Sequence, residues 1–276
     1  MIRNGRVRQA LTHWPLAVAD DHWTLDDTCA AARELGCHGV DLLLPAQWPL
    51  LKKYGLICTI ANCGMPDPVF SKGINNPRYH EEIIARGRAI IDECPDFGVP
   101  NYTMLTGYKW RDADDPSSGE IPLEEGADNC VTAIRALLPH AERAGVNLCL
   151  EHLNTRDSTH DMKGHPGYQG DDIDYIADIV RRVHSPRVKV LFDVYHASVM
   201  NGDLIRRIHE YGDLIGHIHT AGNPGRGELD PSQEINYPAI MQALLAVGYR
   251  GYVSHEFIPT RSPMDGLREA VALCDV

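Results

Sequence analysis

The sequence predicts an α/β fold, a single (β/α)8 TIM barrel that spans residues 1–276 as one domain. The length of 276 residues suits such a barrel, which takes about 250 residues. Amphipathic helical stretches alternate with short apolar runs, and no break in composition divides the chain. This alternation indicates right-handed βαβ units and a parallel sheet. A doubly wound open sheet is the alternative, but no Gly-x-Gly-x-x-Gly motif follows the first expected strand.

The eight expected strands are short runs rich in apolar and β-branched residues. In chain order they cover residues 7–11, 39–44, 56–61, 102–105, 146–151, 188–194, 214–219 and 251–257. Their apolar residues do not alternate strictly with polar ones, which is typical of strands buried on both faces. Glycines such as Gly36 and Gly145 stand where the preceding helical stretches end, as expected for left-handed helix caps.

The helix starts and the long loops complete the pattern. Residues 24–27 (Thr-Leu-Asp-Asp) form a plausible capping box for the first helix, and residues 171–174 place acidic side chains at another helix N-terminus. Three long polar loops follow expected strands, at residues 107–128, 154–172 and 221–233. In a barrel these loops lie at the C-terminal ends of the strands, where active sites are built.

Composition and charge exclude several classes of protein. Hydrophobic residues make up 43% of the chain and charged residues 23%, which is typical of a globular protein rather than a disordered one. The net charge of −12 argues against binding to nucleic acid or to an anionic membrane surface. No apolar run approaches the 18 residues of a membrane span. The eight cysteines form no Cys-x-x-Cys pair, so we expect reduced, buried thiols in a cytoplasmic protein.

Each of the last four expected strands ends in an ionisable residue: Glu151, Asp193, His219 or Glu256. Buried carboxylates that meet at one rim of a barrel repel one another, and a divalent cation between them removes this repulsion. Three carboxylates and one imidazole suit Mn²⁺ or Mg²⁺, with Co²⁺ also acceptable, better than a thiolate zinc site. We therefore expect these four residues to be metal ligands.

Longer motifs around these residues resemble a known family. They include Asp-Val-Tyr-His at 193–196, Gly-His-Ile-His at 216–219 and Pro-Gly-Arg-Gly-Glu at 224–228. The chain resembles the xylose-isomerase-like TIM-barrel superfamily, and within it the hydroxypyruvate isomerase and 2-oxo-tetronate isomerase group. The likeness covers nearly the whole chain and is densest after residue 146.

The resemblance implies an isomerase that acts on a small α-hydroxycarbonyl compound. In this family the metal acidifies the substrate C–H, and proton transfer proceeds through a cis-enediolate. The catalytic acid–base residues would be Glu151 and Glu256. The expected substrate-binding residues are His196, Arg226, Asp157 and Lys163.

Other functions stay open at this point. A ketose 3-epimerase shares most of the motifs and carries a histidine at the position of His219, where hydroxypyruvate isomerases often have glutamine. A non-catalytic sugar-binding barrel and a nuclease resembling endonuclease IV are less favoured, the nuclease because of the acidic charge. The expected partner is a small sugar or 2-oxo acid, with no nucleic acid and no membrane. A homo-oligomer is compatible with the sequence.

Overall fold

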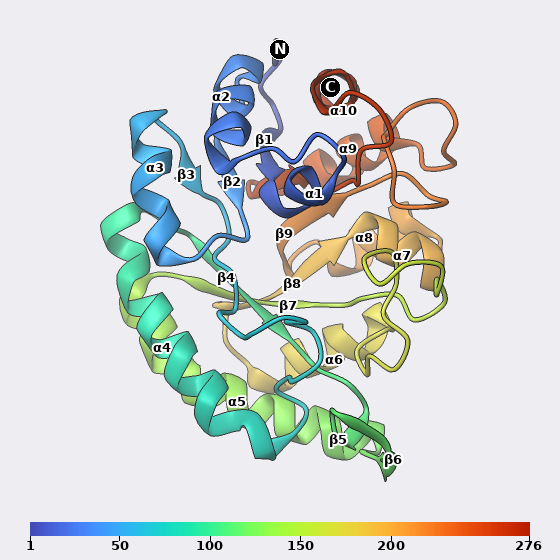
Figure 1. Ribbon diagram of the computed structural model, residues 1–276. Helices are drawn as coiled ribbons and strands as arrows, with labels where there is room; N and C mark the ends of the chain where they lie inside the picture. The colour runs from blue at the N-terminus through green and yellow to red at the C-terminus, as the bar shows by residue number, and fades with distance from the viewer.

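The computed structural model describes residues 1–276 and is a barrel of parallel strands surrounded by helices (Figure 1). Eight strands form its sheet in the order β3-β2-β1-β10-β9-β8-β7-β4. The strands are β1 (Arg8–Thr12), β2 (Gly39–Asp41), β3 (Ile57–Cys58), β4 (Asn101–Leu105), β7 (Asn147–Glu151), β8 (Val188–Asp193), β9 (Ile215–Thr220) and β10 (Tyr252–His255). The two ends of this order meet, because Ala61 pairs in parallel with Tyr102 just beyond β3. The predicted (β/α)8 fold is confirmed.

Helices cover the outside of the strands in Figure 1. They are α1 (His13–Val18), α2 (Leu25–Leu35), α3 (Trp48–Lys53), α4 (His80–Phe97), α5 (Leu123–Ala144), α6 (Ile173–Val183), α7 (Val194–Met200), α8 (Leu204–Tyr211), α9 (Tyr237–Ala246) and α10 (Pro263–Cys274), with two short 3-10 turns, η1 (Pro45–Gln47) and η2 (Pro77–Tyr79). The predicted caps are confirmed at α2, where Thr24 and Asp27 form a capping box, and at α6, where Asp172 accepts from the N–H of Asp174. Gly36 and Gly145 end α2 and α5 with positive φ, as expected.

Two expectations were wrong. Residues 107–128 are not an irregular loop, because they contain the antiparallel hairpin of β5 (Trp110–Asp112) and β6 (Asp115–Glu120) and the first residues of α5. Nearly all of β6 is exposed, so no apolar alternation could reveal it. The capping box opens the second helix rather than the first, because the six-residue α1 follows β1 without a break.

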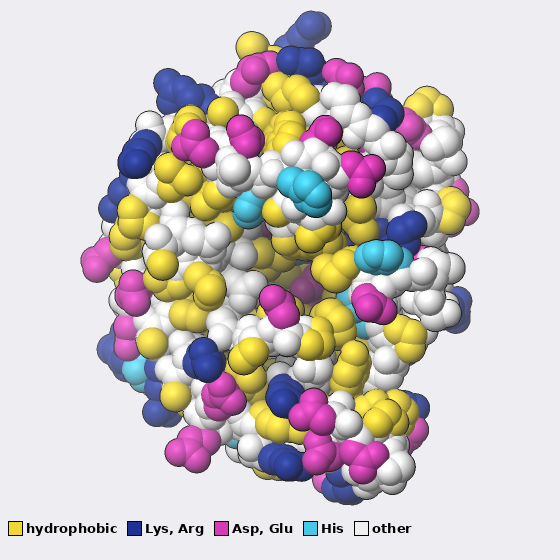
Figure 2. Space-filling view, in the orientation of Figure 1, with side chains coloured by type: hydrophobic (Ala, Val, Ile, Leu, Met, Phe, Trp, Pro, Cys, Tyr) yellow, Lys and Arg dark blue, Asp and Glu magenta, His cyan; other side chains and the backbone are white.

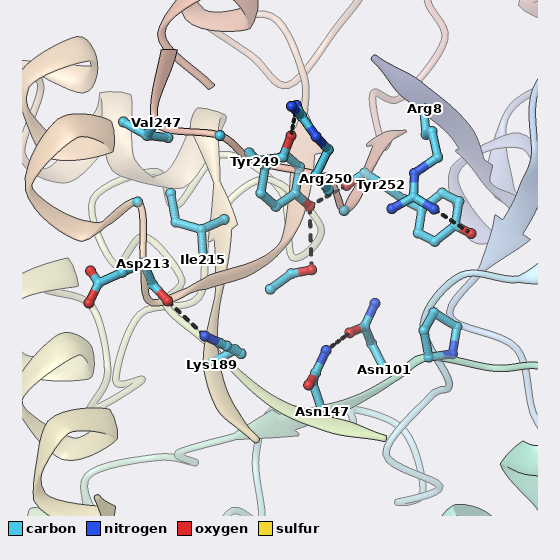
Figure 3. A pocket seen from close by; sticks show the side chains of 15 residues that line it. Arg8, Asn101, Asn147, Lys189, Asp213, Ile215, Val247, Tyr249, Arg250 and Tyr252 are labelled. Atoms are coloured by element: carbon cyan, nitrogen blue, oxygen red, sulfur yellow. Dashed lines mark hydrogen bonds between the residues drawn. The ribbon is translucent and has the colours of Figure 1, made fainter. Parts of the chain in front are cut away.

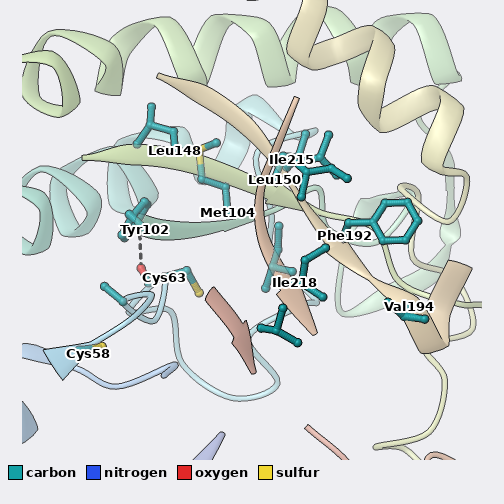
Figure 4. Packing of buried hydrophobic residues seen from close by; sticks show 14 of the residues in the cluster. Cys58, Cys63, Tyr102, Met104, Leu148, Leu150, Phe192, Val194, Ile215 and Ile218 are labelled. Carbon is teal, nitrogen blue, oxygen red and sulfur yellow. Dashed lines mark hydrogen bonds between the residues drawn. The ribbon is translucent and has the colours of Figure 1, made fainter. Parts of the chain in front are cut away.

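The core lies between the strands and the helices. Leu148 and Leu150 of β7 belong to a cluster of 68 buried hydrophobic residues (Figure 4). Cys149 and Glu151 alternate with them along the strand and lie on its other face. All eight cysteines are free thiols and all are buried, as predicted. Burial raises the pKa of Cys29 to about 11, so its reactive thiolate form is suppressed. No helix has both the length and the hydropathy that crossing a membrane requires.

Candidate metal centre and active site

Four side chains from neighbouring strands converge at the C-terminal end of the barrel. Glu151 ends β7, Asp193 ends β8, His219 lies one residue before the end of β9, and Glu256 directly follows β10. One ligand atom from each lies within 4.8 Å of the others, and all four residues are buried. The parallel strands in this order place the four side chains side by side, as the sequence predicts.

Asp41 at the end of β2 orients the histidine of this cluster. Its Oδ2 lies 3.1 Å from Nε2 of His219 and 2.9 Å from Nε2 of His217, so both rings donate to one carboxylate oxygen. Burial alone would raise the pKa of Asp41, but the hydrogen bond from His217 and the charge of His219 hold it well below its usual range. This arrangement assigns one proton of His219 to Nε2 and turns Nδ1 toward the carboxylates. Burial lowers the pKa of His219, but the charge of Glu256 and the hydrogen bond to Asp41 raise it well above its usual range, so without a cation Nδ1 also carries a proton.

A buried arginine contacts the same cluster. Nη2 of Arg226 donates to Oε2 of Glu256 at 2.6 Å and lies 3.6 Å from Oδ2 of Asp193. The other oxygen of Glu256 accepts from the indole N–H of Trp14 at 2.7 Å. Both oxygens of Glu256 therefore accept hydrogen bonds. The carboxylate of Glu151 has a single ion-pair contact, with Nδ1 of His219 at 3.5 Å.

The carboxylates differ in their electrostatic surroundings. Burial raises the pKa of Glu151, and it raises that of Asp193 to about 7. Burial also acts on Glu256, but the charges of His219 and Arg226 outweigh it and lower the pKa to about 2. Three close carboxylates thus do not all ionise readily at neutral pH unless further positive charge is present.

The four residues fit a divalent cation. They offer three carboxylate groups and one imidazole nitrogen, the donor set that Mn²⁺ and Mg²⁺ accept. Nδ1 of His219 is buried without a hydrogen-bond partner, although it lies 3.1 Å from Oε2 of Glu256. A shared cation would replace the proton on Nδ1 and bind both atoms, because a metal ligand needs its lone pair and not a proton.

A cavity of about 750 Å³ opens above the cluster, within the size range of small-molecule sites. Glu151, Glu256 and Arg226 line it, and Trp14 and Phe70 contribute aromatic walls. Figure 2 shows the hollow in the middle of this face, with hydrophobic side chains around it and an acidic group in its depth. The arrangement can hold a small polar compound against two carboxylates.

The remaining predicted substrate residues lie in different places. His196 is buried beside the cluster: its Nε2 is 3.5 Å from Oδ2 of Asp193, and its Nδ1 accepts from the N–H of Asn154. None of the three, His196, Asp157 and Lys163, lines the cavity. The carboxylate of Asp157 accepts from the hydroxyl of Tyr195 instead, at 3.3 Å.

Several site residues escaped the sequence analysis. Asp41 ends β2, but the sequence predicted that this strand runs on to residue 44, so the rule that found the four ligands passed over it. Trp14 follows β1 on a short helix that no pattern signalled. His165 and Phe70, whose rings lie 4.2 Å apart, come from long irregular segments in which only the fold reveals neighbours.

Comparisons with known proteins agree with this fold. Residues 29–275 match the family described as xylose isomerase-like TIM barrel. A putative hydroxypyruvate isomerase from Homo sapiens is 34% identical over 118 residues, which are 43% of this chain and 40% of that protein. A 2-oxo-tetronate isomerase from Cupriavidus necator is 32% identical over 154 residues, 54% of this chain and 56% of that protein. The matches thus span about half the length of these relatives.

Solved structures share the fold over nearly the whole chain. A family 2 AP endonuclease from Brucella melitensis superposes with a TM-score of 0.80 at 23% identity, covering 95% of this chain and 97% of that one. A D-psicose 3-epimerase from Clostridium cellulolyticum H10 has a TM-score of 0.70 at 16% identity, covering 98% and 96%. At these identities the likeness concerns the fold alone. The family match over residues 29–275 shows that the chain belongs to the xylose isomerase-like TIM barrel family.

Proposed function

We propose that this protein is a metal-dependent isomerase of small α-hydroxycarbonyl compounds, with a short 2-oxo acid such as hydroxypyruvate as its substrate. The observation that carries the proposal is the floor of the cavity, where Glu151, Glu256 and Arg226 lie beside Asp193 and His219. The relatives named hydroxypyruvate isomerase and 2-oxo-tetronate isomerase support the same chemistry.

A divalent cation held by the four clustered residues would polarise the substrate carbonyl and acidify the adjacent C–H. Glu151 would remove this proton and return it to the neighbouring carbon, while the hydroxyl proton moves to the former carbonyl oxygen, so that the substrate passes through a cis-enediolate. Glu151 suits this work because its oxygens have fewer partners than those of Glu256, which accept from Trp14 and Arg226. Glu256 would act mainly as a ligand.

Arg226 supplies the positive charge that an acid substrate needs. Its Nη1 donates to the carbonyl of Met162 at 2.7 Å, which holds the guanidinium in place, and its buried Nε has no partner. A guanidinium presents paired N–H groups that match a carboxylate. We propose that a substrate carboxylate binds here. His196 does not line the cavity and lies 3.5 Å from Asp193, so it would act through that carboxylate.

A ketose 3-epimerase is the second candidate, and one observation favours it. Both Glu151 and Glu256 line the cavity, and an epimerase needs proton transfer on two faces of the enediolate. In that case the bond between Arg226 and Glu256 would open when substrate enters, which frees Glu256 to carry a proton.

The test is a substrate panel with the Mn²⁺- or Mg²⁺-loaded protein. Hydroxypyruvate, 2-oxo-tetronates and free ketoses are each incubated with it, and the products are resolved by chromatography. The isomerase proposal predicts turnover of the 2-oxo acids. Efficient epimerisation of free ketoses with no turnover of the acids would replace it with the epimerase, and no turnover of any compound would overturn both.

Replacement of Arg226 by alanine tests the carboxylate site. Arg226→Ala should raise KM for the acid substrate and cost about 2–4 kcal/mol in kcat/KM, the scale for unpairing a desolvated charge. Metal content is measured in the same variant, because Arg226 also contacts Glu256. Arg156→Ala, an exposed arginine bonded only to the carbonyl of Val199, is the control. An unchanged KM in Arg226→Ala would contradict this role.

A further inference from the structure

The N-terminal end of the barrel, opposite the metal cluster, has polar and charged residues that point into the barrel. Successive side chains of a strand point to opposite faces, so two residues four positions apart point to the same face. Asn147 and Lys189 precede Glu151 and Asp193 by four positions in β7 and β8. They therefore face the barrel interior at the N-terminal ends of the strands.

Neighbouring strands add to this layer through their register. Tyr252 precedes Glu256 by four positions and pairs with Arg8 of β1. Asn101 of β4 pairs with Asn147 of β7, and their side-chain amides are hydrogen bonded at 3.0 Å. Barrel interiors are usually filled by bulky branched apolar residues. Here five polar or charged side chains take those positions instead.

These residues line a cavity of about 440 Å³. Figure 3 shows them around a common hollow, with Lys189, Asn147 and Asn101 on one side and Arg8, Tyr252 and Arg250 on the other. The cavity lies at the end of the barrel opposite the metal cluster, so an occupant would not compete with the substrate.

The charge of this cavity is positive, and none of its three cations forms an ion pair. Nζ of Lys189 donates to the backbone carbonyl of Asp213 at 2.7 Å. The guanidinium of Arg8 lies over the ring of Tyr252 at 4.5 Å, and Arg250 donates to the carbonyl of Tyr249. Asp213 is the one acidic residue of the lining, and its carboxylate points away from the other side chains in Figure 3.

We propose that this cavity at the N-terminal end of the barrel, the mouth opposite the metal cluster, binds a small organic anion through a phosphate or carboxylate group. Arginine and lysine offer only donors, five and three N–H groups respectively, and the single contacts of Arg8 and Lys189 leave most of them free. The amide nitrogens of Asn101 and Asn147 donate to the carbonyl of Thr59 and to Asn101, which leaves each one further N–H. The hydroxyl of Tyr252, which accepts from Arg8, adds another neutral donor. The volume suits a compound of metabolite size.

Calorimetric titration of the Mg²⁺-loaded protein tests this site, and the same titration of Arg226→Ala identifies any binding of the probes at the substrate site. Sodium phosphate and sodium succinate are the two probes, each at constant ionic strength set with chloride. Saturable binding is expected for at least one, and the stronger probe identifies a phosphate or a carboxylate ligand. Lys189→Gln and Arg8→Gln should each weaken binding by about tenfold or more, because each removes a charged donor.

Three further variants complete the test. Lys189→Arg keeps the charge and should retain binding. Arg135→Gln on α5 is the matched control, because Arg135 also donates to a backbone carbonyl and has no acidic partner, and its affinity should stay within twofold of the original protein. If the Gln variants at Arg8 or Lys189 unfold, Arg250→Gln, with an exposed side chain, should weaken binding instead. Absence of binding for both probes, or binding that persists in the folded variants of the mouth, would overturn the proposal.

Discussion

At the scale of single residues, one buried carboxylate governs the geometry of the candidate metal centre. Asp41 accepts from His217 and His219, and so decides which nitrogen of His219 faces the carboxylates. Metal-bound histidines commonly donate their second N–H to such an acceptor, which strengthens the ligand. Asp41 does not line the cavity, so it orients His219 and does not contact the substrate.

Asp41→Asn should weaken Mn²⁺ or Mg²⁺ binding by about 10–100-fold, the usual effect of losing such a supporting group. The affinity is measured by calorimetry, and the protonated ring nitrogen of His219 is followed by ¹⁵N NMR. Thr103→Val, which removes a buried hydroxyl without a partner from β4, is the control and should leave the affinity unchanged. Equal metal affinity in Asp41→Asn and the original protein would contradict the positioning role.

The sequence predicted Glu151, Asp193, His219 and Glu256 because each follows an apolar run, a pattern that is local in the chain. It did not predict the pairing of Asp41 with His219, because the two residues are separated by 178 positions and meet only when the barrel closes. The same reason applies to Trp14, whose partner Glu256 comes from the other end of the chain. Short sequence motifs cannot predict contacts between residues that lie far apart in the chain and meet across the barrel.

At the scale of elements, the helix caps were the most predictable feature and the hairpin the least. The capping box at the start of α2 depends on side chains three residues apart, so the sequence shows it directly. The hairpin of β5 and β6 is polar and exposed, and it lacks the buried face that marks a strand. Helix α1 has only six residues and no side-chain cap, so the sequence carries no periodic pattern that predicts it.

Thr24→Ala should lower the free energy of unfolding by about 1 kcal/mol, the usual cost of losing an N-cap hydroxyl. The hydroxyl of Thr24 accepts from the N–H of Asp27, and the replacement leaves that donor without its partner in the helix. Urea denaturation measures the change. Thr132→Ala, inside α5 and exposed, is the matched control and should cause no loss. Equal stability of the two variants would show that this cap contributes nothing.

At the scale of the whole molecule, the two ends of the chain close the barrel. β1 pairs with β10, and the carboxylate of Asp275 accepts from the backbone N–H groups of Arg3, Asn4 and Gly5. Figure 1 shows the termini on the same side of the molecule. Burial alone would raise the pKa of Asp275, but the N–H donors, with that of Asn4 the strongest, hold it below its usual range.

Asp275→Asn should therefore destabilise the protein by about 1 kcal/mol at pH 7. A carboxyl whose folded-state pKa is lowered stabilises the fold above its unfolded pKa of about 4, and this contribution is lost as the pH falls through the folded value. Denaturation at pH 7 and at pH 3 measures both limits, and the difference between variant and original should shrink at pH 3. Asp20→Asn, an exposed acid, is the control. A difference that is the same at both pH values would contradict this linkage.

The central claim is that Glu151, Asp193, His219 and Glu256 hold one divalent cation at the floor of the cavity. A crystal structure of the Mn²⁺-soaked protein, with anomalous scattering recorded for manganese, tests it most directly. We predict a single strong peak per chain, with ligand atoms of all four residues at about 2.0–2.3 Å and Nδ1 as the nitrogen ligand. A structure without a peak at this position, or with the ion held by Asp41 and His217 instead, would contradict the claim.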